Sequence, residues 1–139
     1  MSPRRSDLSF IRRTRKKARR LANTVIGAGF FGGISRLGRL HPLSKPSRHG
    51  VELIEDIEYR RSGNPKHRLY IYRPAHREGP LPVVVYMHGG AFHLLSKDTH
   101  WLMGLAFARA GYLCFNVDYR LAPQHPYPSA VSDTCSALE

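Results

Sequence analysis

The chain has 139 residues, of which 42% are apolar, 10% aromatic and 23% charged. This composition excludes disordered, collagen-like and disulfide-scaffold proteins, and the length suffices for one globular domain with a sizeable core. The formal net charge of +12 is unevenly placed, because residues 1–50 carry thirteen Lys/Arg against the single Asp7. Residues 51–139 carry nine residues of each sign. We therefore expect a basic N-terminal arm, residues 1–50, joined to a neutral globular segment, residues 51–139.

Two features bear on where the protein works. Cys114 and Cys135 have no paired spacing, which indicates a reducing compartment and predicts a cytoplasmic location. The longest uncharged run covers residues 21–35, and its fifteen residues are fewer than the ~18 that a membrane-spanning helix needs. The basic region before this run is too long for a secretory signal, and no small-residue cleavage pattern follows it.

The arm begins with a strongly basic stretch, in which nine of the first twenty residues are Lys or Arg. Apolar residues recur at helical spacing between Ile11 and Val25, which predicts an amphipathic basic helix. Three interpretations stay open: a solvated or weakly packed helix, contact of Arg12–Arg20 with an anionic membrane surface, and nucleic-acid binding. No aromatic residues interleave the basic run, so we expect no nucleic-acid partner. The Pro- and Ser-rich segment His41–Gly50 is typical of a linker.

From Val51 onward the pattern predicts strands alternating with helices, hence an α/β fold. Strands are expected over Leu53–Arg60, Arg68–Arg73, Val83–Met87 and Tyr112–Val117. A helix is expected over Thr99–Ala110, with N-cap chemistry in residues 96–98 and Gly111 as its stop. A second helix starts near Ser129, and its spacing runs on to Glu139. This last feature favours the front part of a larger domain.

The strongest chemical signal is the run Tyr86-Met87-His88-Gly89-Gly90-Ala91-Phe92 at the end of the apolar strand. Backbone N–H groups just past a strand end can point together at a developing negative charge, and glycines let such a loop approach a substrate closely. A second signature follows in Asn116-Val117-Asp118-Tyr119-Arg120-Leu121-Ala122-Pro123, with His125-Pro126-Tyr127-Pro128, Ala130 and Asp133 after it.

Together the two motifs resemble the hormone-sensitive-lipase-like esterases of the α/β-hydrolase fold, over about Val51 to Glu139. The resemblance implies the front half of the hydrolase sheet, strands one to four with the first helix and the start of the second. It implies a carboxylic-ester hydrolase that needs no cofactor and acts on small or medium acyl esters through a Ser–His–Asp triad. It also implies that helices within residues 8–40 contribute to a cap over the site.

The resemblance assigns roles to particular residues. The N–H groups of Gly90 and Ala91 would form the oxyanion hole, while His88 and Gly89 would shape its loop. Phe92, Leu94 and Trp101 are candidates for the wall of an apolar substrate pocket. The residues expected to hold the neighbouring loop, with Asp118 and Arg120 as a structural pair or clamp, are Asp118, Tyr119, Arg120 and Pro123.

The family's catalytic triad has no counterpart in these residues. No serine lies in a G-x-S-x-G context, and in the family pattern the nucleophile, acid and histidine all come later than Glu139. We therefore expect the 139-residue chain to be catalytically incomplete by itself.

Rival interpretations also stay open. The run Gly27-Ala28-Gly29-Phe30-Phe31-Gly32 matches G-x-G-x-x-G, with Glu52 or Glu55 about twenty residues on, which would indicate dinucleotide binding if a strand preceded Gly27. A non-enzymatic adaptor with a lipid- or RNA-binding arm is another. The histidines have no metal-ligand spacing, so we expect no metal site.

Overall fold

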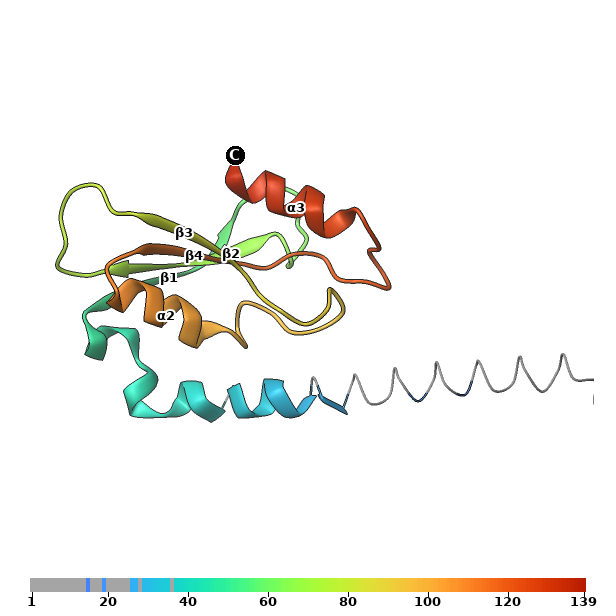
Figure 1. The fold of residues 1–139 in the computed structure, drawn as a ribbon, viewed down its shortest axis with the longest axis horizontal. Coiled ribbons are helices and arrows are strands. Elements are labelled where there is room, and N and C mark those ends of the chain that lie inside the picture. The colour runs from blue at the N-terminus through green and yellow to red at the C-terminus, as the bar shows by residue number, and fades with distance from the viewer. Residues whose placement is uncertain (1–14, 16–18, 20–25, 28, 36) are drawn as a thin grey trace, which may run out of the picture.

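The structure, a computed structural model, describes Arg15, Arg19, Ile26, Gly27 and residues 29–35 and 37–139. Most of the predicted basic helix, residues 11–25, therefore lies outside the described residues. The described part of the chain is a four-stranded sheet with helices on both sides (Figure 1).

The sheet has the strand order β1-β2-β4-β3. The strands are β1 (Val51–Glu58), β2 (Arg68–Pro74), β3 (Val83–Met87) and β4 (Leu113–Val117). The pairs β1–β2 and β2–β4 are antiparallel, whereas β3 runs parallel to β4. The predicted strands are confirmed, with β1 beginning and ending two residues earlier than its pattern indicated. The α/β class is confirmed, with a mixed sheet that places β3 at one edge.

Helix α2 (Trp101–Arg109) crosses over from β3 to β4 and packs on β2 and β4. It begins two residues later than predicted, since Ser96 and Thr99 are used in a turn of their own, with the Thr99 hydroxyl donating to the Ser96 carbonyl at 2.7 Å. The predicted stop is correct. Gly111 has φ +96°, and the N–H groups of Gly111 and Tyr112 donate to the carbonyls of Ala108 and Phe107, which is a Schellman motif.

The core lies between α2 and the sheet. Its buried members are Val51, Tyr70, Tyr72, Trp101, Leu105, Ala108 and Cys114. Gly104 faces the ring of Tyr72 so closely that a Cβ there would lie 2.3 Å from the ring. Only glycine lets the helix backbone approach this tyrosine, and the aromatic ring thus fixes the height of α2 above the sheet.

Helix α3 (Ser129–Leu138) lies on the other side of the sheet from α2 (Figure 1). Its start agrees with the predicted one. The described residues between 26 and 40 are helical and run beneath α2 in this view. The Ser35 hydroxyl donates to the Thr99 carbonyl at 3.1 Å, and Arg39 pairs with Asp98 at 3.1 Å and with Glu55 at 2.7 Å. These contacts join the helix to the domain.

The segment predicted as a linker is ordered. It forms two 3₁₀ helices, η1 (Pro42–Ser44) and η2 (Pro46–His49). The Ser44 side chain is buried and donates to the Arg39 carbonyl at 2.7 Å, so the Pro-rich run makes a fixed corner between the N-terminal helix and β1. The division into two units at residue 50 stays a prediction.

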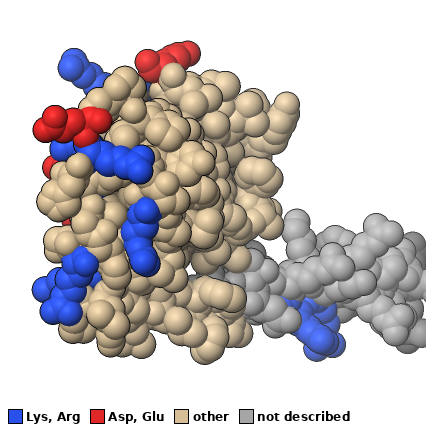
Figure 2. Space-filling view, turned by 60° about the vertical axis from the view of Figure 1, so that its left-hand side comes forward, with Lys and Arg blue, Asp and Glu red and all other residues tan. Residues whose placement is uncertain are grey.

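None of the helices among the described residues is both long enough and apolar enough to cross a bilayer. Lys, Arg, Asp and Glu side chains are interspersed on the folded part, as the sequence count for residues 51–139 predicts (Figure 2).

Candidate active site

The loop after β3, residues 88–96, leaves the carboxyl end of a parallel strand, the edge of α/β sheets where ligands usually bind. Three consecutive residues of this loop have positive φ: Gly90 at +121°, Ala91 at +53° and Phe92 at +61°. A Cβ on Gly90 would lie 2.2 Å from the Leu94 carbonyl oxygen, so the turn excludes every other residue at position 90. Ala91 and Phe92 hold a conformation that L-residues rarely adopt, which is a sign of a functionally constrained turn.

The turn leaves the N–H groups of Gly90 and Ala91 free among the described residues. The Gly90 carbonyl accepts from the N–H groups of His93 and Leu94 at 3.0 and 3.1 Å. The N–H groups of Gly90 and Ala91 donate to no other described residue. Unpartnered backbone N–H groups at a strand end are available for an anion or a developing oxyanion.

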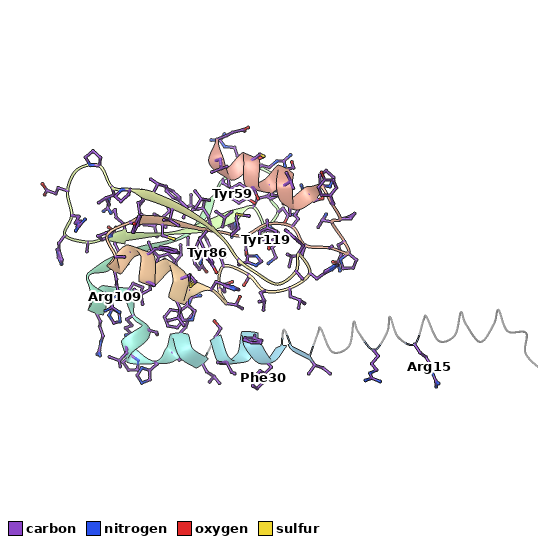
Figure 3. All side chains as sticks on the ribbon, in the orientation of Figure 1. Arg15, Phe30, Tyr59, Tyr86, Arg109 and Tyr119 are labelled. Carbon is purple, nitrogen blue, oxygen red and sulfur yellow. The ribbon has the colours of Figure 1, made fainter. Side chains whose placement is uncertain are left out.

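His88 anchors the start of this loop. Its side chain is buried, and its Nδ1 lies 2.8 Å from the Gly89 carbonyl oxygen. The imidazole stacks on the Tyr119 ring with centroids 4.3 Å apart, and the Tyr119 hydroxyl donates to the His88 carbonyl at 2.7 Å. Figure 3 labels Tyr119 among the side chains of the folded domain. His88 is thereby held as a support beneath the loop.

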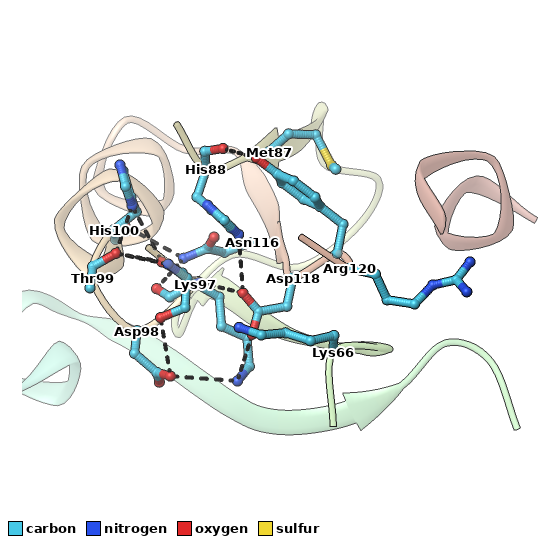
Figure 4. A network of polar contacts seen from close by, with 12 residues as sticks. Lys66, Met87, His88, Lys97, Asp98, Thr99, His100, Asn116, Asp118 and Arg120 are labelled. Carbon is cyan, nitrogen blue, oxygen red and sulfur yellow. Dashed lines mark hydrogen bonds and ion pairs between the residues drawn. The ribbon is translucent and has the colours of Figure 1, made fainter. Parts of the chain in front are cut away.

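Asp118, just after β4, is the polar centre under the loop (Figure 4). Its Oδ1 accepts from the Lys97 backbone N–H at 2.8 Å and lies 3.3 Å from His88 Nε2, outside hydrogen-bond geometry. The Lys66 ammonium is 3.5 Å from Oδ2. Burial by itself would raise the pKa of Asp118, but the contact with His88 and the charges of Lys66 and Lys97 outweigh it, and the pKa is lowered.

Arg120 does not pair with Asp118, which corrects the expected structural pair. Its guanidinium instead pairs with Asp133 of α3, and Nη2 donates to Oδ1 at 2.7 Å. The backbone N–H of Arg120 donates to the other oxygen, Oδ2, at 2.9 Å. Asp133 is fully buried and also faces His67 Nε2 at 3.1 Å. Burial would raise the pKa of Asp133, yet the hydrogen bonds from Arg120 more than compensate and lower it. Asp118 and Arg120 thus each hold the loop after β4, through different partners.

The loop after β4 also contacts the turn directly. The Ala122 N–H donates to the Phe92 carbonyl at 2.8 Å, and His93 Nδ1 lies 3.1 Å from the Ala122 carbonyl. Pro123, the next residue, is exposed and follows a cis peptide bond. The two sequence motifs are therefore adjacent in space, joined at Phe92 and Ala122.

A cavity of about 330 Å³ opens beside the turn. It is lined by Met87, His88, Gly89, Ala91, Phe92, Tyr119, Ala130, Val131 and Thr134. Of the three predicted wall residues only Phe92 contributes to it. Leu94 lies under Gly90, and Trp101 is buried in the core and lines a second cavity against the N-terminal helix. The structure does not bring these three side chains together in one pocket.

The glycine-rich run at residues 27–32 lacks the context that a dinucleotide site needs. Ile26, Gly27 and residues 29–35 are all helical, so no strand-to-helix turn presents backbone N–H groups to a pyrophosphate there. The dinucleotide interpretation is wrong for this reason. Within the described part of the chain, no three His, Cys, Asp or Glu side chains gather as metal ligands would.

Comparison with known proteins agrees with this geometry. A family model described as the alpha/beta hydrolase fold matches residues 84–139, which include both motifs. The chain carries the N-terminal part of an α/β-hydrolase fold. The expected resemblance to the hormone-sensitive-lipase-like esterases is confirmed by the relatives that follow.

Carboxylesterase NlhH of Mycobacterium tuberculosis is 40% identical over 102 residues, which are 72% of this chain and 32% of that protein. The structure of a hyperthermophilic esterase from Pyrobaculum calidifontis superposes with a TM-score of 0.59 at 38% identity, covering 82% of this chain and 35% of that one. Esterase LipW from Mycobacterium marinum gives a TM-score of 0.61 at 30% identity, covering 83% and 35%. The chain spans about a third of the length of these relatives.

Sequence reasoning assigned no role to several residues that build the site. Lys97 and Asn116 are buried, and the Asn116 amide donates to the Lys97 carbonyl at 3.0 Å. From the turn before β2, Lys66 reaches Asp118 in the loop after β4, and His67 reaches Asp133 of α3. A lysine and an asparagine in otherwise apolar or loop segments carry no periodic signal, and the only available clue was an asparagine within a strand, where that residue is unfavourable.

Proposed function

We propose that residues 51–139 supply the oxyanion-hole part of a carboxylic-ester hydrolase acting on small or medium acyl esters. The observation that carries this proposal is the pair of N–H groups, of Gly90 and Ala91, left without a partner among the described residues beside an apolar cavity. The similarity to NlhH, named a carboxylesterase, supports the same assignment.

The chemistry follows from where charge develops. When a nucleophile attacks an ester carbonyl, the oxygen becomes an anion, and preorganised donors about 2.7–3.1 Å away stabilise it. Gly90 and Ala91 would donate to this oxygen, and Phe92 would contact the substrate. The nucleophile, acid and histidine are proposed to come from the segment that follows this one in the family pattern.

The proposal is tested with a hybrid enzyme. In the hybrid, the segment of this chain that aligns with NlhH replaces the matching segment of NlhH, whose remaining segments supply the triad. Hydrolysis of p-nitrophenyl acetate and butyrate by the folded hybrid is expected to have the same order of kcat as NlhH. A hybrid that folds, as circular dichroism reports, but hydrolyses neither ester would contradict the proposal.

We further propose that the N-terminal arm adsorbs to anionic membrane surfaces, as a peripheral contact of a cytoplasmic enzyme. Four residues of the N-terminal helix, Ile26, Phe30, Leu37 and Leu40, are 67–79% exposed, and their spacing places them on one helix face. Phe30 points away from the sheet (Figure 3). Residues 8–51 contain eleven Lys/Arg and no acidic residue, a combination that suits anionic lipid rather than a protein core.

Vesicle sedimentation tests the membrane proposal. Binding to vesicles containing phosphatidylserine is expected, with less binding to phosphatidylcholine alone and less at high salt. Replacing Phe30 and Leu37 by Ser should reduce binding, while Leu43→Ser, an equally exposed leucine outside this face, should not. Equal loss with all variants, or binding to RNA in preference to vesicles, would count against the proposal.

A further inference from the structure

We propose that Lys97 is a positioning residue for the turn at Gly90 and Ala91, acting through its buried ammonium group and Asp118. The inference rests on the proposed oxyanion role of that turn. It assigns a function to a charged side chain that neither sequence motif includes.

Lys97 is only 5% exposed, and its ammonium nitrogen lies near residues from β1, from β2 and from the loop after β4. Figure 4 shows this side chain beside Asp118. The ammonium nitrogen lies 3.1 Å from Asp56 of β1, 4.2 Å from the centre of the Tyr70 ring on β2, and 3.8 Å from Asp118 after β4. Asp56 reaches it because β1 is irregular there, with a register shift between Ile54 and Ile57 and a φ of +56° at Asp56. A bulge of this kind re-aims a side chain at a cost in backbone strain.

Filling this space with the charged Lys97 side chain costs more free energy than filling it with an apolar one. Removing an ammonium group from water costs free energy that its partners only partly return, and an apolar side chain of similar volume is often as stable or more so. Lys97 therefore contributes something other than bulk, and its position relative to the loop indicates what this is.

Both ends of the loop meet one carboxylate. At the start of the loop, His88 Nε2 lies 3.3 Å from Asp118 Oδ1, and at its end the Lys97 N–H donates to the same oxygen at 2.8 Å. The Lys97 ammonium faces the other oxygen, Oδ2. An ionised Asp118 thus links the start of the loop to its end, and the charge of Lys97 favours the ionised form of Asp118.

Asp118 and Lys97 are surrounded by charged groups from several elements of the fold. Asp118 faces Lys66 from the turn before β2, His88 from the loop after β3, and Lys97. The Lys97 ammonium also lies 3.9 Å from the carboxylate of Asp98. Asp98 forms a second ion pair, with Arg39 of the N-terminal helix. Without the Lys97 charge, Lys66 is the one lysine left beside Asp118 among the described residues. The carboxylate should then take up a proton at higher pH.

The test uses the 139-residue chain and two readouts from NMR. The first is the pH midpoint of the residue-97 amide shift, which reports the protonation of Asp118. The second is hydrogen exchange at the His93 and Leu94 amides, which are bonded to the Gly90 carbonyl. The variants are Lys97→Met and Lys97→Arg, with Glu52→Gln as the matched control, because Glu52 forms an exposed ion pair with Arg73 on the same strand as Asp56.

For Lys97→Met we expect a higher pH midpoint and about tenfold faster exchange at both amides, corresponding to about 1.4 kcal/mol of local stability. Lys97→Arg should restore both values, and Glu52→Gln should change neither. If Lys97→Met does not fold, Asp56→Asn, which removes the carboxylate that competes with Asp118 for the Lys97 ammonium, should shift the pH midpoint in the opposite direction, to lower pH. An unchanged midpoint in the folded variants, or failure of Lys97→Arg to restore it, would overturn the proposal.

The same substitutions in the hybrid connect the inference to catalysis. Lys97→Met should lower kcat more than it raises KM, and Lys97→Arg should recover kcat. Neither NMR readout depends on ester hydrolysis. An inactive hybrid with the expected NMR changes would therefore contradict the proposed function alone, and an active hybrid without them would contradict the role of Lys97 alone.

Discussion

At the scale of single residues, the turn after β3 has two neighbouring residues with positive φ, of which only the second has room for a side chain. Gly90 has φ +121° and no room for a side chain, whereas Ala91 has φ +53° and carries one. Ala91 thus holds a left-handed conformation at a cost of about 1 kcal/mol relative to glycine. The rest of the loop, anchored by His88 and Asp118, maintains this conformation.

The first prediction compares these two positions in the hybrid. Gly90→Ala should lower kcat by about 10²–10³, the loss expected when one oxyanion donor is displaced, because the new Cβ collides with the Leu94 carbonyl. The control, Ala91→Gly, relieves strain and should keep kcat and raise the melting temperature slightly. Steady-state kinetics with p-nitrophenyl butyrate measures both. A folded Gly90→Ala hybrid with normal kcat would exclude Gly90 from the oxyanion hole.

The second prediction concerns Asp133, the buried carboxylate clasped by Arg120. Asp133→Asn should lower the free energy of unfolding by at least about 2 kcal/mol, because the Arg120 and His67 groups lose a buried ionic partner. Glu52→Gln, at an exposed ion pair, should cost less than about 0.5 kcal/mol. Urea titrations followed by circular dichroism provide the measurement.

This pair also has a defined pH dependence. The pKa of Asp133 is lower in the folded chain than in an unfolded one, so its ionisation stabilises the fold above about pH 4 and this contribution is lost as the pH falls further. The free energy of unfolding of the Asp133→Asn variant should therefore fall less steeply below about pH 4 than that of the original chain. Parallel acid profiles for the two chains would show that Asp133 is not the group responsible.

At the scale of elements, β3 is the exposed edge of the described sheet. It pairs with β4 on one side only, and Val83 at its start is 57% exposed. In hydrolases of this fold, the strand that precedes the nucleophile lies beside this one. An apolar edge strand is prone to pair with other chains.

The third prediction follows from that edge. Val83→Lys should reduce concentration-dependent aggregation of the 139-residue chain, because a charge on an edge strand opposes intermolecular pairing. Val131→Lys serves as the control, since Val131 is similarly exposed but lies on α3. Light scattering after size-exclusion chromatography reports the difference. Equal aggregation of the two variants would show that the chains associate through a surface other than the edge of β3.

At the scale of the whole molecule, the proposed function assigns to this chain only one part of a catalytic arrangement. The described residues contain the proposed oxyanion turn, the residues that support it and a cavity, and the chain spans 32% of the length of NlhH. A turn that stabilises an oxyanion supplies only part of the rate of ester hydrolysis, and the larger part requires a positioned nucleophile and base as well.

The fourth prediction is that the 139-residue chain by itself does not turn over p-nitrophenyl acetate. None of its serines lies in the G-x-S-x-G context that exposes a nucleophile in this fold. Turnover is measured by release of p-nitrophenol, and labelling with a fluorophosphonate probe reports any reactive serine. Stoichiometric labelling of a serine together with turnover would show that the chain contains a nucleophile of its own.

The sequence by itself determined the class of fold, the order of strands and helices, and the position of the turn. The strand Val83–Met87 is a continuous apolar run, glycines mark sharp turns such as that at Gly111, and the motif around Gly90 is local, so each can be recognised within a few residues. Periodicity and turn chemistry are properties of neighbouring residues, and they survive without knowledge of the rest of the fold.

Only the tertiary structure decided which side chains meet. It paired Arg120 with Asp133 instead of Asp118, separated Trp101 from Phe92, and placed the glycines at 27–32 in a helix. It also buried Lys97 between Asp56 and Asp118, residues 41 and 21 positions away along the chain. Such contacts depend on strand order, on the bulge in β1 and on the height of α2 above the sheet, and none of these is encoded in a local pattern of apolar and polar residues.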